Sequence, residues 1–370
     1  MSQFNWQHIT SPTVLVDTYR AKRNIETMQN KAVQAAVQLR PHFKTHQSVD
    51  IGRWFRDAGT HAIAVSSVLM AQQFERAGWR DIMLAIPLNP RELVALNRLA
   101  GECSLTLTIE HEDALQALNR LGNEVKVVIE VDAGYGRTGM DWRQPQRISD
   151  LANAALQLRQ VKQVGLLLHA GNSYQAEGDD GIAKIHEESL QRLAAVRQHI
   201  AAPAAQQLFV TAGDTPTCSR MQSFPGVDEI RPGNYVFYDL QQQHIGACSW
   251  DDIALTIACP VIARYPERGE VVVHGGAVHL SKDFLLSKSR YEGRPCYGQV
   301  MRTSPQGWYG EPIEGAFMHG LSQEHGKVRM PAELIEQTQL GDLLVIAPAH
   351  SCLTMAAMQD FVCINGQTNM

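Results

Sequence analysis

The stretch 165–213 decides the fold, and it contains "GLLLHA" (165–170), "GIAKIHEESLQRLAAVRQH" (181–199) and "LFVTAG" (208–213). The first and last runs are apolar and of strand length, and the middle segment has the spacing of an amphipathic helix. A strand, a helix and a second strand in this order are typical of a βαβ unit, in which the two strands lie parallel.

The same alternation of apolar runs and helical segments continues on both sides of this unit. The other predicted strands are "RPHFKT" (40–45), "AIAVSS" (62–67), "DIMLAI" (81–86), "LTLTIE" (105–110), "KVVIEVD" (126–132) and "EIRPG" (229–233). With the two strands above, these make about eight strands that alternate with helices, which predicts a (β/α)8 TIM barrel of the α/β class. The earlier run "TVLVD" (13–17) lies outside this set.

The pattern of predicted elements changes after about residue 245. Runs such as "DIALTIACPVIARY", "GEVVVHGG" and "GDLLVIAP" are joined by turns with Gly and Pro, and no helical segments separate them. This pattern predicts an antiparallel β domain. We therefore expect the barrel over residues 21–245 and a C-terminal β domain over residues 246–370.

The composition excludes several classes of protein. The formal net charge of the 370 residues is −5, with 33 basic against 38 acidic side chains, which gives no electrostatic support for a nucleic-acid or membrane-surface partner. The first residues lack the pattern of a secretory signal, and no apolar run approaches the length of a membrane span. Seven scattered cysteines show no CxxC pair and no disulfide framework. We expect a reduced, cytoplasmic protein.

The segment "QLRPHFKTHQ" (38–47) places Arg40, His42, Lys44 and His46 at alternate positions. If the segment is a strand, these four side chains lie on one face. At the carboxyl end of a barrel strand, Lys44 would lie where barrel enzymes keep their active sites. Neighbouring cations and desolvation lower the pKa of a lysine and make its amine a nucleophile. A basic surface segment without a catalytic role is the alternative, and it stays open.

The segment "EVDAGYGRTGM" (130–140) contains a literal GxGxxG at Gly134, Gly136 and Gly139. This spacing is the fingerprint of dinucleotide-binding proteins, but no helix start follows and no acidic residue ends a second strand about twenty positions later. A dehydrogenase that uses NAD is therefore disfavoured. The alternatives are a turn that directs Arg137 into the site and a purely structural turn.

Two segments at neighbouring strand ends are rich in small and hydroxyl residues. "TAGDTPTCS" (211–219) and "EIRPGNY" (229–235) offer Gly213, Thr215, Gly233 and Asn234. Small residues and a helix start provide N–H donors that suit a phosphate, and barrel enzymes often bind phosphate after strands 7 and 8. Each loop on its own is also compatible with a plain turn.

The segment "APAHSCLT" (347–354) follows a strong strand and carries His350 and Cys352. One imidazole and one thiolate at this spacing suit zinc, and two protein ligands would leave positions open for water or substrate. The alternative is a buried cysteine beside a hydrogen-bonded histidine.

Taken together, these segments resemble the pyridoxal-phosphate enzymes of the alanine-racemase-like fold, in the D-threonine aldolase and D-serine dehydratase branch. The motifs that carry the resemblance are "RPHFKTH", "DAGYGRTG", "HAGNSY", "TAGDTPT", "EIRPGNYVFYD", "QEHG" (323–326) and "HSC". They occur in the order of the family and span nearly the whole chain. The cofactor, pyridoxal 5'-phosphate (PLP), is implied by this resemblance and not by composition or periodicity.

The resemblance also implies roles for individual residues. Lys44 matches the Schiff-base lysine, Arg137 the arginine near the phenolic oxygen, and His169 a residue packed on the pyridine ring, with Tyr174 beside it. Gly213, Thr215, Gly233 and Asn234 match the phosphate-binding segments, and Arg231 matches the arginine that faces the pyridine nitrogen in the racemases. His350 and Cys352 match a divalent-metal pair, with zinc expected first and manganese as the alternative. Lys44, His350 and Cys352 are the implied catalytic residues.

The function implied is a PLP- and metal-dependent lyase acting on small β-hydroxy D-amino acids, by D-serine dehydratase-like elimination to a 2-oxo acid and ammonia. Alternatives are retro-aldol cleavage to glycine and an aldehyde, racemisation, and a PLP carrier without activity, which would lack the β domain. The resemblance further implies a homodimer and an N-terminal segment (1–20) that packs with the β domain. One departure is "VVHGGAVHLSKD" (272–283), where His274 and Gly275 replace the expected "DA" of "VDAG" and leave the exact substrate open.

Overall fold

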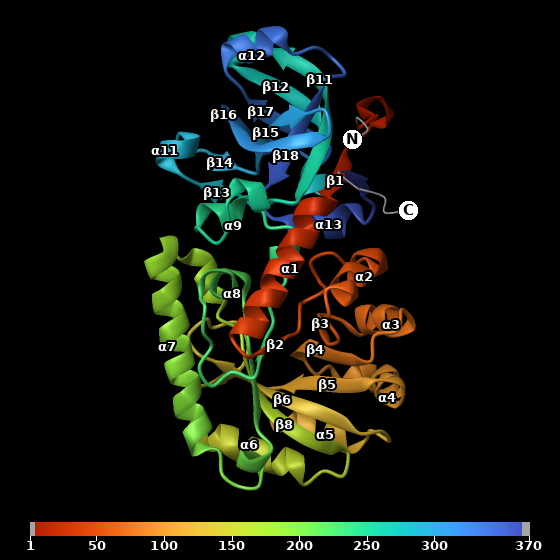
Figure 1. Cartoon of the computed structure of the whole chain (residues 1–370), viewed down its shortest axis with the longest axis vertical. Coiled ribbons are helices and arrows are strands. Elements are labelled where there is room, and N and C mark those ends of the chain that lie inside the picture. Colours follow the sequence, from red (N-terminus) through yellow and green to blue (C-terminus); the bar gives the residue numbers. More distant parts are fainter. Residues whose placement is uncertain (1–3, 365–370) are drawn as a thin grey trace. The chain divides into compact units, whose positions relative to one another are not determined.

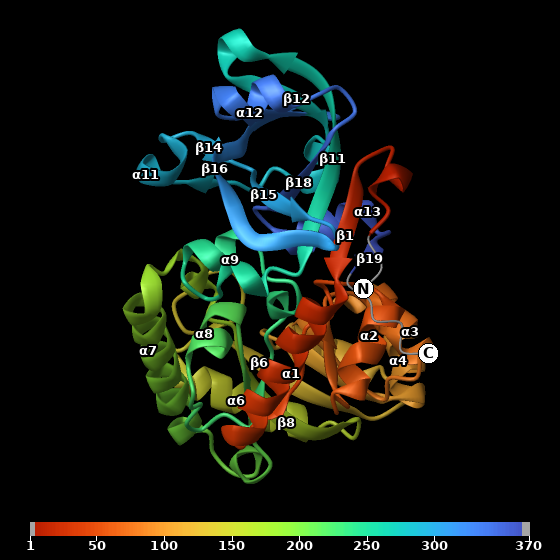
Figure 2. The ribbon, with the colours of Figure 1, turned by 45° about the horizontal axis from the view of Figure 1, so that its top comes forward.

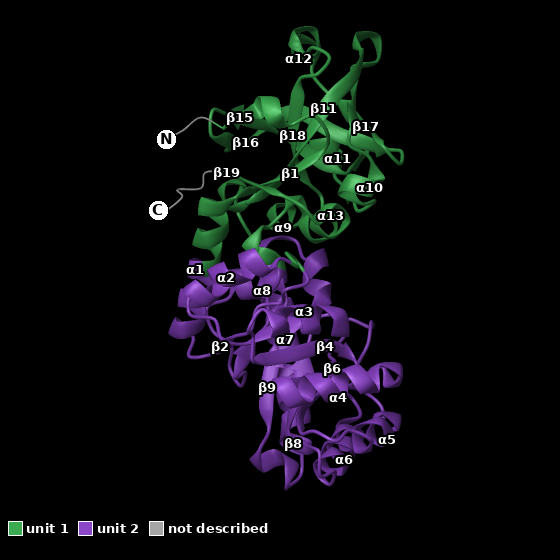
Figure 3. Ribbon diagram, turned by 90° about the vertical axis from the view of Figure 1, so that its right-hand side faces the viewer, with its two compact units in different colours: residues 1–25, 45–47, 234–370 green, residues 26–44, 48–233 purple. Residues whose placement is uncertain are grey.

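The computed structural model describes residues 4–364, which form two compact units (Figure 3). The barrel unit comprises residues 26–44 and 48–233. The β unit comprises the residues up to 25, residues 45–47 and the residues from 234 onward. Helix α1 (Thr18–Gln34) passes from the β unit into the barrel unit. No helix within residues 4–364 is both long and apolar enough to cross a membrane.

Eight parallel strands form the barrel unit. Their order in the sheet is β2 (Gln38–Leu39), β10 (Glu229–Ile230), β9 (Phe209–Ala212), β8 (Val161–Leu168), β6 (Val125–Asp132), β5 (Ser104–Ile109), β4 (Asp81–Pro87) and β3 (Ile63–Val65), and β7 (Met140–Asp141) adds to β6. A parallel bridge between His42 and Ala64 joins the β2 segment to β3 and closes the ring. The predicted barrel is therefore confirmed.

Helices follow most of these strands and surround them on the outside (Figure 1). They are α2 (Val49–Asp57), α3 (Val68–Arg76), α4 (Leu93–Glu102), α5 (Asp113–Asn119), α6 (Pro145–Leu156), α7 (Gly178–His199) and α8 (Thr215–Arg220). Ser48 and Ser67 accept backbone N–H groups as N-caps of α2 and α3. Because helices cover the strands on one side and the barrel interior lies on the other, strands such as β6 are apolar along most of their length.

The β unit is built on a closed ring of six antiparallel strands. These strands are labelled in Figure 1 and drawn from a second direction in Figure 2. Around the ring they are β11 (Leu255–Tyr265), β12 (Glu270–His274), β17 (His325–Arg329), β16 (Gly307–Leu321), β15 (Gly298–Ser304) and β18 (Leu343–Pro348). β1 (Thr13–Asp17) pairs antiparallel with β11 and parallel with β19 (Val362–Ile364), and β13 (Leu285–Leu286) pairs with β14 (Pro295–Cys296). The antiparallel β domain predicted from the sequence is confirmed.

Short helices complete the β unit: α9 (Leu240–His244), α10 (Ala277–Leu280), α11 (Lys288–Tyr291), α12 (Ala332–Gln337) and α13 (Ser351–Met358). The inside of the ring is apolar, with Ile257, Val273, Met318 and Ile346 fully buried in one cluster. Helices α10 and α13 pack on each other, so the loop that leaves β12 lies beside the loop that leaves β18.

Candidate active site

Lys44 lies in a turn that follows the first barrel strand. β2 ends at Leu39, His42 makes the single bridge with Ala64, and residues 43–46 form the turn. The side chain of Lys44 is exposed. Its amine is thus presented at the carboxyl end of the parallel strands, the face on which barrel enzymes build their active sites.

The turn is fixed by Phe43, which is fully buried. Its ring packs against Phe55, Phe74 and Trp79, with centroid distances of 5.0, 4.8 and 5.1 Å. Aromatic contacts of this kind add to the stabilisation that comes from burial alone. The residue before Lys44 therefore anchors the turn in the core while the lysine faces outward.

The predicted strand 40–45, with four basic groups on one face, is wrong. Arg40 is buried and Lys44 is exposed, while His46 is buried in the segment 45–47 of the β unit. The ladder continues only as far as His42 and Phe43, whose backbone N–H groups donate to the carbonyls of Pro232 and Ala64, and residues 43–46 then form a turn. Only His42 and Lys44 remain together as neighbours in the barrel unit.

Arg40 belongs to an ion-pair network within the barrel. Its Nε donates to Oε2 of Glu229 over 2.7 Å, and its Nη1 donates to Oδ1 of Asp81 over 2.7 Å. Burial would lower the pKa of Arg40, but the two carboxylates raise it, so the guanidinium stays charged. Arg40 therefore joins strands β2, β10 and β4 and is not a direct neighbour of the Lys44 amine.

A group of charged and imidazole side chains shares the electrostatic environment of Lys44. Burial lowers the pKa of His42 well below its usual value, and the charges of Lys44, Arg231, His169 and Arg137 lower it further. Burial also lowers the pKa of His169 to about 3, with Arg137, Lys44 and Arg231 contributing in the same direction. Both imidazoles are therefore neutral near pH 7, and the three cations make this part of the barrel attractive to an anion.

Hydrogen bonds set the tautomers of these two imidazoles. Nδ1 of His169 donates to the carbonyl of Gly213 over 2.9 Å, which leaves Nε2 as an acceptor. Nδ1 of His42 accepts the backbone N–H of Lys44 over 3.3 Å, which places the proton of the neutral ring on Nε2.

The lowered pKa of His169 predicts a loss of stability in acid. Below about pH 6.5 His169 is protonated in the unfolded chain but stays neutral in the folded chain. At pH 5 this difference lowers the free energy of unfolding by about 2 kcal/mol. His169→Gln keeps a donor for the Gly213 carbonyl and removes the titration. Urea unfolding at pH 7 and pH 5 should show a loss in the wild type that exceeds the loss in the variant by about this amount. Equal losses in both proteins would contradict the assignment.

Arg231 is buried, and its side chain is held by two neighbours. Its Nη1 donates to Oγ1 of Thr211 over 2.5 Å and its Nη2 donates to the carbonyl of Leu168 over 2.9 Å. The Thr211 hydroxyl in turn donates to Oε1 of Glu229 over 2.6 Å. Burial lowers the pKa of Arg231 to about 10, so the guanidinium remains a cation at neutral pH. A fixed buried cation of this kind is a suitable partner for an anion or for a ring nitrogen that accepts a hydrogen bond.

Arg137 lies on the loop that contains the three glycines of the GxGxxG pattern. Asp132 Oδ1 accepts the backbone N–H groups of Gly134, Tyr135 and Gly136 at 2.8, 2.9 and 3.0 Å, which closes the loop. After the loop comes strand β7 and not a helix. The dinucleotide fingerprint is therefore absent at this place, because the backbone N–H groups face a carboxylate and no helix N-terminus follows. The Arg137 side chain lies over the Tyr135 ring, 5.4 Å from its centre.

The predicted phosphate residues of the barrel unit come together. The backbone N–H of Thr215 lies 3.4 Å from Oη of Tyr174, and the backbone N–H of Gly233 lies 3.4 Å from Oγ1 of Thr215. Gly213 packs so closely on the backbone of Arg231 that a Cβ would lie 2.5 Å from its nitrogen. Only glycine fits there, so the ends of β9 and β10 can approach each other.

Asn234, the last predicted phosphate residue, belongs to the β unit and turns its side chain toward other groups. Its Nδ2 donates to Oδ2 of Asp239 over 2.6 Å and lies 3.1 Å from Oγ of Ser351 and 3.4 Å from Sγ of Cys352. Asp239 Oδ2 also accepts the backbone N–H of Ser351 over 3.0 Å. The Asn234 side chain thus supports the loop that carries His350 and Cys352, a role that its sequence motif does not predict.

His350 and Cys352 lie at the start of α13, directly after β18. Nδ1 of His350 is 2.7 Å from Oδ2 of Asp283, and Sγ of Cys352 is 3.3 Å from Oγ1 of Thr45, the residue that follows Lys44 in the chain. Burial would lower the pKa of His350, but its hydrogen bonds to Asp283 and Cys352 raise it to about 11. Burial would raise the pKa of Cys352, but His350 lowers it.

The imidazole and the thiolate therefore share a proton in the absence of a metal. Since Nδ1 of His350 faces Asp283, its remaining nitrogen, Nε2, is the one that faces the thiol. A divalent ion could replace that proton, because a thiolate and a neutral imidazole are metal ligands. Asp239 and Asp283, which support the pair, were missed from the sequence. The available signal was their place as the last residues of the motifs "EIRPGNYVFYD" and "VVHGGAVHLSKD".

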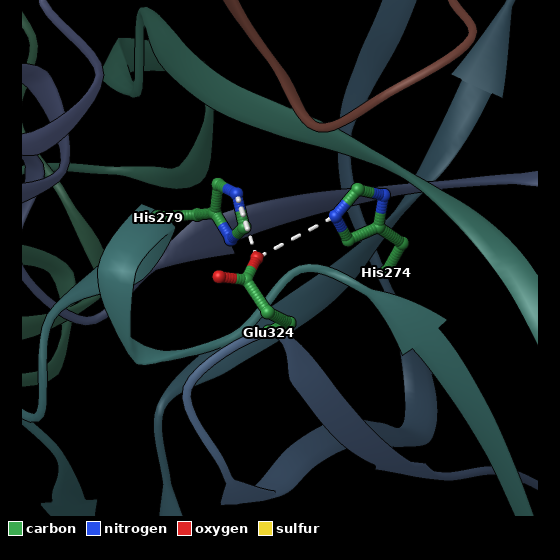
Figure 4. A group of neighbouring side chains, drawn as sticks. All are labelled: His274, His279 and Glu324. Carbon is green, nitrogen blue, oxygen red and sulfur yellow. Dashed lines mark ion pairs between the residues drawn. The ribbon is translucent and has the colours of Figure 1, made fainter.

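The segment 272–283, which differs from the expected family pattern, also places His274 and His279 on either side of Glu324 (Figure 4). Oε2 of Glu324 lies 3.6 Å from Nε2 of His274 and 3.8 Å from Nε2 of His279. Nδ1 of His279 accepts the backbone N–H of Gly276 over 3.1 Å, so the neutral ring carries its proton on Nε2, toward Glu324. A metal-bound histidine needs the opposite tautomer. In this arrangement the three residues form a polar cluster in which Nδ1 of His279 is already occupied by a backbone N–H.

The residues present fit both groups that the resemblance implies. Three cations, Lys44, Arg137 and Arg231, share the barrel unit with a glycine-lined strand end, which suits an anionic phosphate ester carrying an aldehyde that reacts with an amine. The imidazole of His350 and the thiol of Cys352 are hydrogen-bonded neighbours. One nitrogen and one sulfur atom together are a donor set that suits zinc.

Comparison with known families agrees with this geometry. Residues 16–241 match the family model "Alanine racemase, N-terminal domain", and residues 254–364 match the model "Putative serine dehydratase domain". The first match alone covers more than half of the chain.

Characterised relatives match over nearly the whole length. The D-threo-3-hydroxyaspartate dehydratase of Delftia sp. (strain HT23) is 30% identical over 94% of this chain and 92% of its own. The D-serine dehydratase of Dictyostelium discoideum is 26% identical over 98% of this chain and 95% of its own. The D-threonine aldolase of Arthrobacter sp. is 24% identical over 92% and 86% of the two chains.

The solved structure of the Delftia dehydratase superposes with a TM-score of 0.88 at 28% identity, over 98% of this chain and 96% of that chain. A cysteine-to-alanine mutant of a D-threo-3-hydroxyaspartate dehydratase, solved in its metal-free form, superposes with a TM-score of 0.87 at 28% identity, over 98% of this chain and 96% of that chain. The chain therefore belongs to the alanine-racemase-like family of pyridoxal-phosphate lyases, in the branch that holds the D-serine dehydratases and D-threonine aldolases.

Proposed function

We propose that this chain is a dehydratase of β-hydroxy D-amino acids, which converts them to a 2-oxo acid and ammonia as a D-serine dehydratase does. The observation that carries the proposal is the exposed amine of Lys44 beside two arginines and two neutral imidazoles. The relatives that match over the whole chain support it, because two of the three named above are dehydratases of this substrate class.

In this proposal Lys44 holds PLP covalently, and Arg137 and Arg231 provide fixed positive charge for it. His169 would pack on the ring with Tyr174 beside it, and Gly213, Thr215 and Gly233 would line the phosphate. Arg231 is held rigidly by Thr211 and Leu168, so it can face a ring nitrogen without reorganisation. When bound, PLP supplies the capacity to accept the electron pair of the Cα–H bond.

The protein's own contribution is proton transfer and orientation. The amine of Lys44 would act as the general base that removes the proton from Cα of the substrate. Neutral His42, whose Nδ1 accepts the Lys44 backbone N–H, holds the lysine turn without competing for that proton. Loss of hydroxide from Cβ and hydrolysis of the resulting enamine then give the 2-oxo acid and ammonia.

His350 and Cys352 would hold a divalent metal, which would supply Lewis-acid chemistry for the departure of the β-hydroxyl. Zinc is the metal that a thiolate and an imidazole favour, whereas manganese prefers carboxylates. Support comes from the position of both side chains at the start of α13, with Asp283 on Nδ1 of His350, and from the D-threo-3-hydroxyaspartate dehydratase cysteine mutant that was solved in a metal-free form.

A second candidate is retro-aldol cleavage to glycine and an aldehyde, because the D-threonine aldolase of Arthrobacter sp. matches over 92% of this chain. The same residues would serve, with the proton leaving the β-hydroxyl and the Cα–Cβ bond breaking in place of Cβ–O.

The test is a product assay with D-serine, D-threo-3-hydroxyaspartate and D-threonine, with the L-enantiomers as controls. We expect 2-oxo acid and ammonia in equal amounts from D-serine or the hydroxyaspartate, and a fall in rate of about 100-fold or more after chelation, since a Lewis acid is worth several kcal/mol. Added zinc should restore the rate. Glycine and an aldehyde as the products would establish the aldolase instead, and full activity after complete metal removal would refute the metal's role.

We also propose, by resemblance, that the enzyme acts as a cytoplasmic homodimer. Sedimentation velocity of the PLP-loaded protein measures the oligomeric state directly. A monomer of 41.1 kDa as the active species would contradict the homodimer.

A further inference from the structure

Asp283 makes a short contact with the candidate metal ligand His350. Its Oδ2 lies 2.7 Å from Nδ1 of the imidazole. A carboxylate only accepts, so the proton sits on Nδ1. A neutral ring that carries its proton on Nδ1 has the lone pair of Nε2 available for a metal.

The side chain of Thr354 connects the two segments that carry Asp283 and His350. Thr354 on α13 is fully buried, and its hydroxyl oxygen lies 3.2 Å from the carbonyl of Leu280 and 3.2 Å from the carbonyl of His350. It thus links the end of α10, three residues before Asp283, to the start of α13. The backbone N–H of Asp283 also lies 3.2 Å from Oγ of Ser281, which shapes the loop between the two.

The other ligand of the pair is supported from a different side. Asp239 is fully buried, and it holds the loop through the backbone N–H of Ser351, while Asn234 lies 3.4 Å from Sγ of Cys352. Asp283 is the carboxylate that contacts the imidazole itself, so each ligand has its own support. This division makes the contribution of Asp283 separable by mutation.

The contact contributes little to folding. The side chains of His350 and Asp283 are 28% and 50% exposed, and exposed ion pairs are worth about 0–1 kcal/mol. The same contact is expected to have a large effect on metal affinity. A partner that orients a histidine ligand and raises its basicity typically changes that affinity about 10- to 100-fold. Its effect is therefore expected on binding and not on stability.

We infer that Asp283 is a positioning residue that presents Nε2 of His350 to a divalent metal, completing a carboxylate–histidine–metal arrangement with Cys352. The inference rests on the proposed metal role of the His350–Cys352 pair. It assigns a purpose to the loop 281–283, which lies at the end of the segment that departs from the family pattern.

The test is titration of the PLP-loaded, metal-stripped protein with cobalt(II), followed by the thiolate-to-cobalt absorption, with zinc affinity from competition against a chromophoric chelator. Asp283→Ala should weaken binding about 10- to 100-fold while the band at saturating cobalt persists. Asp283→Asn, whose amide oxygen can still accept from Nδ1, should lie between wild type and alanine.

Glu324→Gln is the matched control, because Glu324 is 47% exposed, lies near two histidines and does not contact His350. It should leave both affinity and stoichiometry unchanged. A lost equivalent of cobalt in this variant would instead show that the His274–His279–Glu324 cluster binds metal.

The metal role of the His350–Cys352 pair and the positioning role of Asp283 can be refuted separately. If wild type shows no thiolate-to-cobalt band, or His350→Ala and Cys352→Ala keep it, the metal pair itself is refuted. If those two variants lose the band but Asp283→Ala binds zinc and cobalt as tightly as wild type, the positioning role alone is refuted. Urea unfolding of each stripped variant confirms that affinities are compared between folded proteins.

Discussion

Replacing Lys44 by alanine is expected to reduce kcat on a β-hydroxy D-amino acid by at least about 10⁴-fold and to abolish the visible absorption of bound cofactor. Lys44 is proposed both to anchor the cofactor and to carry the Cα proton, and a positioned general base alone contributes about 10²- to 10⁴-fold. Fold stability should change little, because the side chain is exposed and Phe43 anchors the turn.

The matched control is Lys162→Ala. Lys162 is an exposed lysine near the amino end of β8, where it pairs with Glu124, so its loss should leave kcat and the absorption band intact. Borohydride reduction followed by peptide mapping adds a second readout, because the trapped cofactor should appear only on the peptide that contains Lys44. A trapped cofactor on another lysine, or a Lys44→Ala enzyme with a normal absorption band, would refute the assignment.

The layout of the fold follows from local patterns in the sequence. Alternating strand and helix segments predict the barrel because each βαβ unit repeats the same periodicity, and the change after about residue 245 predicts the antiparallel domain. The main error in the predicted elements is the strand 40–45. Its ladder ends at His42 and Phe43 and the chain turns over residues 43–46, and the alternation of residue types does not mark that end.

The site is predictable to the extent that its residues stand in recognisable segments. Lys44, Arg231 and the His350–Cys352 pair were singled out that way. Their supporting groups were not, because a contact such as Asp283 with His350 joins positions 67 residues apart. Nothing in a single sequence distinguishes such a carboxylate from a solvated one. The same reason explains why the side chain of Asn234 was expected at a phosphate and is found at Asp239.

Arg40 shows the reverse error, since it was grouped with Lys44 by spacing and is found in a buried ion pair. Arg40→Met is expected to lower the free energy of unfolding by about 3–5 kcal/mol, because it leaves a buried carboxylate without its cation. Glu229 would lose its direct ion pair and keep the hydrogen bond from the Thr211 hydroxyl and the charge of Arg231, and its side chain is 5% exposed. Urea unfolding at pH 7 measures the loss.

Two further variants separate a buried charge from simple loss of packing. In Arg40→Met/Glu229→Gln the uncompensated charge is gone and the Gln oxygen can still accept from Thr211, so a large part of the loss should be recovered, as expected when both members of a buried pair are replaced. Arg53→Met, which breaks the exposed pair with Asp50, should cost no more than about 1 kcal/mol. If Arg40→Met were as stable as Arg53→Met, the network of Arg40 with Glu229 and Asp81 would not be a structural element of the barrel. A double variant no more stable than Arg40→Met would trace the loss to packing, because removal of the charge would then have changed nothing.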